Sequence, residues 1–357
     1  MLYEINEKII KLEMEGRKII KLNIGDPDQQ TPMEIIKTAI NAMKKGKTKY
    51  ASAAGEMRLR EALAEIHEVD ADNIVITPGS KWGVFAVMYL LLSKGDNIII
   101  PSPHWTAYEL AAKSLGVDVK LVKTRLESNW EVNVEDLKAA INNKTKLIIL
   151  NNPNNPTSKV MNEKTVEKIV SIANERGIKI LSDEVYADIS FVKTKSLLEF
   201  EGEHIVVRSF SKTFAMTGWR IGYVIADKTL TDKIVKLNQI TVTNVPVFLQ
   251  EAALKALELR NQIIKVMRKK YQKRADLACK IFLDTKLKFT KPEAPFYIFP
   301  KSEGLNSETF SFNLLDKGVA VAPRTSFGDY LEHFRISLTA PDDEIELGLK
   351  IIAEAFK

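Results

Sequence analysis

Cysteine is nearly absent from this chain of 357 residues, and histidine is scarce. The single cysteine, Cys279, excludes an intrachain disulfide and is typical of proteins from a reducing compartment. We expect it to be a buried and unreactive thiol. The four histidines are scattered without the spacing of metal ligands, so no metal site is predicted.

Long apolar runs and basic segments are also missing. The longest apolar stretch, residues 84–92, is about half of a membrane span, and residues 1–17 lack the apolar centre of a signal peptide. The net charge of +6 is spread over lysines that alternate with acids, which predicts a solvated surface rather than a nucleic-acid site. We therefore expect a cytoplasmic protein with neither a membrane nor a nucleic-acid partner.

Short β-branched runs alternate with helical segments through the middle of the chain. The predicted strands are residues 73–77, 97–100, 117–122, 146–150, 178–181, 205–207 and 221–225. Helices predicted over 81–92 and 163–176 follow two of them. This rhythm favours the α/β class, with a three-layer, mostly parallel but mixed, seven-stranded sheet. Ligands of such sheets bind at the carboxyl ends of the strands.

The pattern changes after about residue 261. The segments that follow are a charged helix at 263–283, a strand at 296–299, a helix at 307–317, a strand at 334–338 and a helix at 342–356. We predict a large cofactor domain of residues 36–261 and a smaller α+β domain of residues 1–35 and 262–357 that closes over it.

Reactive side chains follow several predicted strands. Lys212 lies just after one strand, Asp183 just after another, and Arg220 comes eight residues after Lys212. Taken singly, each has an ordinary explanation: a surface lysine, a turn or helix-capping carboxylate, and a surface ion pair. The loop of residues 151–157, rich in Asn and Pro, is equally compatible with a surface turn.

In combination and in this order, the motifs resemble the class I/II aminotransferase family of fold-type-I pyridoxal-phosphate enzymes. The motifs are Asn155-Pro156-Thr157, Ser182-Asp183-Glu184-Val185-Tyr186, Ser209-Phe210-Ser211-Lys212 and Gly218-Trp219-Arg220-Ile221-Gly222. The resemblance extends from Gly25 to Arg335. It implies an aminotransferase with pyridoxal 5'-phosphate as its cofactor.

The resemblance also assigns roles around that cofactor. It implies that Lys212 holds the cofactor as a Schiff base and shuttles a proton, and that Asp183 keeps the pyridine nitrogen protonated. Tyr186 and Asn155 are implied to hydrogen-bond the ring oxygen. The remaining implied cofactor ligands are Gly79, Ser80, Lys81, Ser209 and Arg220 around the phosphate, and Trp105 stacked on the ring.

Substrate and subunit contacts are implied in the same way. Arg335 resembles the clamp for the substrate α-carboxylate, and Gly25, Trp105 and Asn155 are implied to line the substrate site. Tyr50 resembles the tyrosine that reaches the phosphate of a partner subunit, which implies a homodimer.

The chain departs from the family pattern at several positions. Ser158 stands where glycine is usual, and we expect it to alter only the turn. Arg324 replaces a small residue near the expected substrate mouth, and His104 stands where tyrosine is common. Ala294-Pro295 replaces the glycine-alanine that precedes Phe296-Tyr297. These changes leave the side-chain specificity open.

The predicted reaction is transfer of the amino group of an L-amino acid to 2-oxoglutarate by a ping-pong mechanism. The donor is expected to be aspartate, or a broad range that includes aromatic amino acids. A dicarboxylate needs a second cation, for which Lys81 and Arg324 are candidates, whereas an aromatic side chain would contact Trp105, Phe296 and Phe327. Alternatives of the same fold are a carbon–sulfur lyase, a decarboxylase and, more distantly, a cofactor-binding regulatory module.

Overall fold

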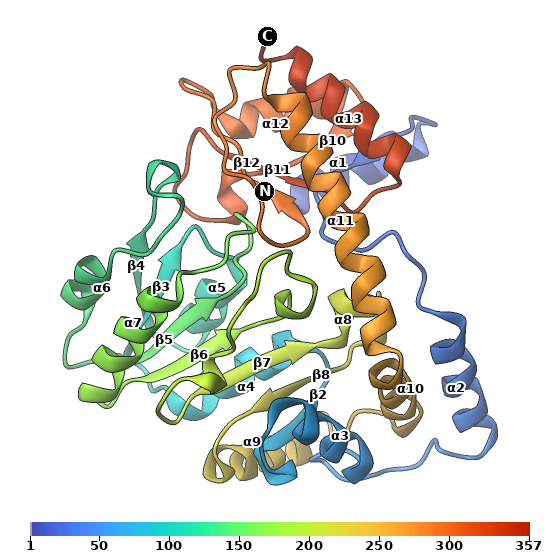
Figure 1. The fold of residues 1–357 in the computed structure, drawn as a ribbon, viewed down its shortest axis with the longest axis vertical. Coiled ribbons are helices and arrows are strands. Elements are labelled where there is room, and N and C mark those ends of the chain that lie inside the picture. Colours follow the sequence, from blue (N-terminus) through green and yellow to red (C-terminus); the bar gives the residue numbers. More distant parts are fainter. Residues whose placement is uncertain (1) are drawn as a thin grey trace.

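The computed structural model describes residues 2–357, with side chains from residue 4 onward. Figure 1 shows a large sheet with helices on both sides, below a smaller group of short strands and helices. The helices are α1 (Leu2–Met14), α2 (Met33–Lys44), α3 (Met57–His67), α4 (Ser80–Leu91), α5 (Ala107–Ser114), α6 (Val134–Ala140), α7 (Glu163–Glu175), α8 (Phe210–Thr213), α9 (Lys228–Ile240), α10 (Val247–Glu258), α11 (Arg260–Phe282), α12 (Ser307–Asp316) and α13 (Asp342–Glu354). The strands are β1 (Ile20–Lys21), β2 (Ile74–Thr77), β3 (Asn97–Ser102), β4 (Asp118–Lys123), β5 (Thr145–Asn151), β6 (Lys179–Asp183), β7 (Ile205–Ser209), β8 (Gly222–Ile225), β9 (Tyr297–Ile298), β10 (Val319–Ala320), β11 (Ala322–Pro323) and β12 (Phe334–Ser337).

The large sheet confirms the predicted seven strands and their mixed, mostly parallel arrangement. Its strand order is β2-β8-β7-β6-β5-β3-β4. Only β8 runs antiparallel to its neighbours β2 and β7 within this sheet. Strand β6 extends two residues beyond the predicted end and includes Asp183. That carboxylate is therefore held by the sheet and not by a free loop.

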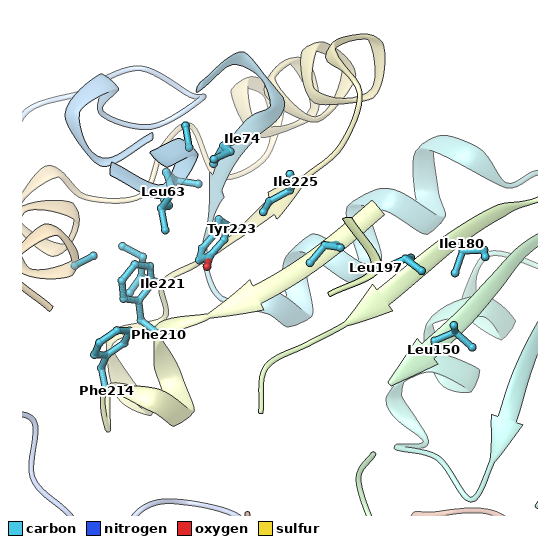
Figure 2. Packing of buried hydrophobic residues seen from close by; sticks show 14 of the residues in the cluster. Leu63, Ile74, Leu150, Ile180, Leu197, Phe210, Phe214, Ile221, Tyr223 and Ile225 are labelled. Atoms are coloured by element: carbon cyan, nitrogen blue, oxygen red, sulfur yellow. The ribbon is translucent and has the colours of Figure 1, made fainter. Parts of the chain in front are cut away.

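Apolar side chains cover both faces of the large sheet, as a strand buried on both sides requires. Helices α4, α5 and α9 pack on one face. Helices α2, α3, α7 and α10 pack on the other, where Figure 2 shows Leu63, Tyr223 and Phe210 pointing into one shared core. Fully burying a side chain such as Leu63 contributes about 1.5–3 kcal/mol to the stability of the fold. The predicted three-layer order follows from these two cores.

The smaller group of elements is built from both ends of the chain. Strand β1 pairs in parallel with β10, while β11, β12 and β9 form an antiparallel sheet. One apolar core contains Ile20 and Leu22 together with Phe334, Ile336 and Leu349. Residues more than 300 positions apart in the sequence therefore stabilise each other.

Helix α11 connects the two groups. Figure 1 shows it running from the large sheet up to the short strands, over 23 residues or about 34 Å. In the C-terminal half of α11, the buried Arg274 donates hydrogen bonds to Asp28 and Asp342. One side chain thus ties the helix to the segment before α2 and to the start of α13.

Within the described residues, every helix is too short or too polar to span a bilayer. Cys279 lies partly buried on α11, and burial raises the pKa of its thiol, so the unreactive protonated form predominates at neutral pH.

Candidate active site

A cavity of about 660 Å³ opens at the carboxyl ends of β5, β6 and β7, where Asn151, Asp183 and Ser209 are the last strand residues. The short strands β9 and β12 contribute its opposite wall. A volume of this size suits a cofactor together with a small substrate. The predicted site residues in its lining are Gly25, Ser80, Lys81, Trp105, Asn155, Asp183, Tyr186, Ser209, Lys212, Arg220 and Arg335.

Asp183 presents a buried carboxylate to this cavity, with 3% of its surface exposed. The Tyr108 hydroxyl donates to Oδ2 at 2.6 Å, and the Val185 amide donates to Oδ1 at 3.3 Å. Burial raises the pKa of Asp183 to about 6, although the Tyr108 hydrogen bond opposes that shift. Across the residues that the structure describes, no cation pairs with this carboxylate. A ligand with a protonated nitrogen would supply the missing charge.

Lys212 is the third residue of α8, the short helix that begins directly after β7. Its Nζ donates to the Gly25 carbonyl oxygen at 2.5 Å, which points the amine into the cavity. Burial lowers the pKa of Lys212, and the charges of Arg335 and Arg220 lower it further. A lower pKa increases the fraction of neutral amine, which is the nucleophilic and basic form.

One end of the cavity is organised for an anion. Gly79 precedes the first turn of α4 with a φ of +82°, and a Cβ atom there would lie 2.5 Å from Nη2 of Arg220. The guanidinium therefore packs against the backbone at the helix N-terminus, beside Ser80. The hydroxyls of Ser209 and Ser211 lie 2.9 Å apart in the same lining. A helix N-terminus, an arginine and two hydroxyls together favour a phosphate group.

Arg335 enters from β12 and is 5% exposed. Its Nη1 donates to Asn155 Oδ1 at 2.9 Å, and its Nη2 donates to the Asn23 carbonyl oxygen at 2.6 Å. The guanidinium lies over the rings of Tyr297 and Phe327, at 4.2 and 4.6 Å from their centroids. These contacts fix its orientation, and its other N–H groups stay free for a carboxylate.

Two tyrosines meet on the floor of the cavity. The hydroxyls of Tyr186 and Tyr297 are 3.0 Å apart, and burial raises the pKa of Tyr186 well above its usual value. The loop that carries Asn155 is tied to the same region, because the Asn155 amide donates to Asn151 Oδ1 and Asn151 Nδ2 donates to the Asp183 carbonyl oxygen.

Sequence reasoning missed several residues of this cavity. Tyr108, the second residue of α5, lies three positions after Trp105, and their rings are 5.4 Å apart, so the short spacing could have indicated it. Ser211 and Tyr297 stand inside quoted motifs. Phe296 was expected to contact substrate, which is wrong: it packs against Tyr271, at 4.3 Å between ring centroids, outside the cavity lining. Phe296 immediately precedes β9, and Tyr297, the first residue of that strand, lines the cavity instead.

Other predicted residues lie apart from the cavity. Tyr50 is 88% exposed and outside its lining. Arg324 was a candidate for a second substrate-binding cation, but it forms ion pairs with Glu308 and Asp329 and does not line the cavity. Lys81, the other candidate, remains in the lining, with Nζ 4.9 Å above the Trp105 ring.

His104 stands where tyrosine is common in the family. His104 is buried, 3.3 Å from Glu109, and is not part of the cavity lining. No cluster of three or more His, Cys, Asp or Glu residues in the described chain is placed to hold a metal ion.

Comparison with known proteins places this site in a family. The sequence matches the family described as aminotransferase class I and II over residues 17–352. The aspartate aminotransferase of Thermococcus kodakarensis is 38% identical over 352 residues, which cover 99% of this chain and 92% of that protein. Aromatic-amino-acid aminotransferase 2 of Thermococcus litoralis is 35% identical, with 98% and 95% covered. A solved structure of the Thermus thermophilus aspartate aminotransferase with maleate has a TM-score of 0.95 at 30% identity and covers 99% of this chain and 96% of that one. The chain therefore belongs to the class I and II aminotransferase family.

Proposed function

We propose that this protein uses pyridoxal 5'-phosphate to move the amino group of an L-amino acid to a 2-oxo acid. The observation that carries the proposal is one cavity lined by an amine of lowered pKa, a buried carboxylate without a cationic partner, and an anion site: Lys212, Asp183 and Arg220. When bound, pyridoxal phosphate supplies an aldehyde and a cationic ring that takes up electrons from the substrate Cα.

The residues around the cavity fit that cofactor. Asp183 would hold the ring nitrogen in its protonated form, since its carboxylate forms no ion pair within the described residues. Arg220, Ser209 and the N-terminus of α4 would hold the phosphate. Trp105 would cover one ring face, and Tyr186 and Asn155 would bind the ring oxygen.

The protein's own side chains then handle the substrate. Arg335 binds the α-carboxylate with the N–H groups that Asn155 and Asn23 leave free. Nζ of Lys212 accepts the Cα proton as a general base and delivers a proton again in the return half-reaction. Burial of Lys212 supports this role because it disfavours the charged ammonium.

A single carboxylate clamp implies a ping-pong order. Amino donor and oxo acid both need Arg335, so the first product has to leave before the second substrate binds. Initial rates at several fixed acceptor concentrations should give parallel double-reciprocal lines. Intersecting lines would contradict a shared site.

The substrates are proposed from the relatives and from the cavity. The similar proteins named above include an aspartate and an aromatic-amino-acid aminotransferase. Lys81 offers a cation at the cavity wall, and Trp105 and Phe327 offer aromatic surface. We therefore propose aspartate, with aromatic amino acids as further donors, and 2-oxoglutarate as acceptor. A panel of donors assayed for glutamate formation tests this choice.

Covalent trapping tests the cofactor proposal directly. Borohydride treatment of the cofactor-loaded protein should attach the cofactor irreversibly to the peptide that contains Lys212. The Lys212→Ala variant should lose this product and transaminase activity, whereas Lys233→Ala, an exposed lysine of α9, should keep both. Full activity of Lys212→Ala would refute the proposal. Release of ammonia without formation of a new amino acid would favour the lyase alternative.

We further propose the two-domain division and the dimer implied by the resemblance. Residues 1–35 and 262–357 would close on residues 36–261, with α11 as the connection. Tyr50 is exposed and lies outside the cavity lining of its own chain. It would complete the phosphate site of a partner subunit.

A further inference from the structure

We infer that Ser158 is a positioning residue, which holds Tyr297 beneath Arg335 and thereby sets the affinity of the site for the substrate carboxylate. The inference rests on the proposed function, since it concerns the same carboxylate clamp. Ser158 was expected to shape only a turn, but its side chain also contacts a distant segment.

Ser158 occupies a conformation that is unfavourable for a residue with a side chain. Its φ is +54°, in the left-handed region, and it is completely buried. Its amide donates to the Asn154 carbonyl oxygen at 2.8 Å, as a tight turn requires. Glycine would adopt this conformation without strain. A buried serine persists there only if surrounding contacts hold it.

The side chain makes one such contact, and it is long-range. The Tyr297 amide donates to Ser158 Oγ at 3.0 Å, across 139 positions of sequence. The Ser158 carbonyl oxygen also accepts hydrogen bonds from the amides of Glu293 and Ala294. Backbone bonds thus join the two segments, while the hydroxyl, among the described residues, hydrogen-bonds to Tyr297 alone.

An independent contact keeps the two segments together without that hydroxyl. Lys159, largely buried, forms an ion pair with Glu293, and the Val160 amide donates to the other Glu293 oxygen at 3.0 Å. Loss of the serine hydroxyl should therefore leave the junction folded. Its effect should be confined to the placement of Tyr297.

Tyr297 transmits its position to the clamp. Its ring lies 4.2 Å from the Arg335 guanidinium carbon, and its hydroxyl lies 3.0 Å from that of Tyr186. A Cβ atom on Gly25 would lie 1.9 Å from the Tyr297 hydroxyl, so the ring already fills the space beside that backbone. Arg335 is also held by its hydrogen bond to Asn155. A shift of Tyr297 therefore changes the angle at which Arg335 meets a carboxylate.

The decisive variant is Ser158→Gly, which removes the hydroxyl and the backbone strain together. We expect the dissociation constant of maleate, measured by calorimetry on the cofactor-loaded protein, to rise about fivefold, because a displaced Tyr297 leaves Arg335 misaligned and weakens one hydrogen bond to the carboxylate. KM for the amino donor should rise in parallel, with kcat changed less. The melting temperature should change little, since relief of strain offsets the loss of the hydrogen bond to the buried Tyr297 amide. A merely structural serine would instead leave maleate affinity unchanged.

Glu68→Gly is the matched control. Glu68 has a φ of +55° at the exposed end of α3, so its replacement relieves the same strain away from the cavity. It should leave maleate affinity at the wild-type value. In a Tyr297→Ala background, Ser158→Gly should have no further effect on maleate binding, because its route to Arg335 has been removed. If that double variant does not fold, the single-variant titration still decides.

The outcomes separate this inference from the proposed function. Unchanged maleate affinity in an otherwise active Ser158→Gly protein would overturn the role of Ser158 and leave the proposed function standing. A wild-type protein that neither binds maleate nor transaminates would overturn both.

Discussion

Two residues of the cavity are driven by burial toward their neutral forms. Burial raises the pKa of Asp183 to about 6 and lowers the pKa of Lys212. Both shifts have the same physical cause, because low-dielectric surroundings penalise either sign of charge. Without a ligand, both groups lower the free energy of unfolding of the protein. A ligand that brings a cationic nitrogen to Asp183 restores that stability. A site of this kind trades stability for binding.

Asp183→Asn should therefore stabilise the cofactor-free protein at neutral pH. The folded pKa of about 6 exceeds the unfolded value of about 3.9, so the wild-type protein loses stability as pH rises from about 4 to 6. The lost stability amounts to at most about 3 kcal/mol above that range. Urea unfolding should show Asp183→Asn gaining this stability at pH 8 but not at pH 4.

The same substitution should impair cofactor binding, since Asn carries no charge for the ring nitrogen. Asp284→Asn, at an exposed position, is the control and should change neither property. An Asp183→Asn protein that is less stable at pH 8 would contradict the unpaired-charge description of this site.

At the scale of elements, the site depends on where helices begin. Helix α4 starts after β2 and helix α8 starts after β7, so Ser80 and Lys212 meet at one edge of the sheet. The sheet fixes these starting points, and short turns leave little freedom for the residues that follow. Gly79, directly before α4, leaves no room for a side chain beside Arg220.

Gly79→Ala should weaken binding of pyridoxal phosphate by at least about tenfold, since the new methyl group would displace the Arg220 guanidinium. Absorbance titration of the cofactor-free protein measures this effect. Gly177→Ala is a matched control, because its φ is +63° but nothing lies within 4 Å of an added Cβ. Equal losses of cofactor affinity in both variants would show that backbone strain, not Arg220, is responsible.

At the scale of the whole molecule, two histidines with lowered pKa values should govern acid stability. Burial lowers the pKa of His67 to about 3 and that of His333 to about 4. Since the unfolded value is about 6.5, the unfolded chain binds more protons, and stability falls as pH drops below about 6.5. Asp183 acts in the opposite direction between about pH 4 and 6, but one carboxylate is outweighed by two histidines.

His333→Phe tests this expectation. Both ring nitrogens of His333 lack a hydrogen-bond partner in the described structure, and the ring stacks on Phe299 at 5.0 Å between centroids. Phenylalanine should fit the same space, so the variant should be more stable at pH 5 and show a smaller loss between pH 7 and 5. Urea midpoints at the two pH values measure both effects. An unchanged pH dependence would assign acid stability to other groups.

The proposed dimer can be tested by mixing two defective proteins. Lys212→Ala lacks the reactive amine, and Tyr50→Ala should lose cofactor affinity. If Tyr50 serves the partner's site, a mixed dimer contains one site with both residues intact. Co-refolding should therefore restore activity that neither variant has alone. No gain in activity would place Tyr50 outside the partner's site.

Fold class and most chemistry could be predicted because they depend on local patterns. Short apolar runs, such as residues 98–100 and 147–150, mark the central strands whatever their neighbours are. Lys212, Asp183 and Arg335 each belong to a short contiguous sequence motif, and all three line the cavity. Tyr50 and the domain boundaries stay predictions, because they concern contacts beyond one compact cavity.

The sequence alone determined the sheet, its helical layers and the family, because hydrophobic period and motif order are properties of neighbouring residues. Only the tertiary structure decided which of Phe296 and Tyr297 faces the cavity, that Arg324 is held by Glu308 and Asp329, and that Tyr108 reaches Asp183. Each of these depends on the direction of a side chain relative to a segment far away in sequence. Local patterns carry no information about that direction, since it is set by packing and hydrogen bonds formed only once the chain has folded.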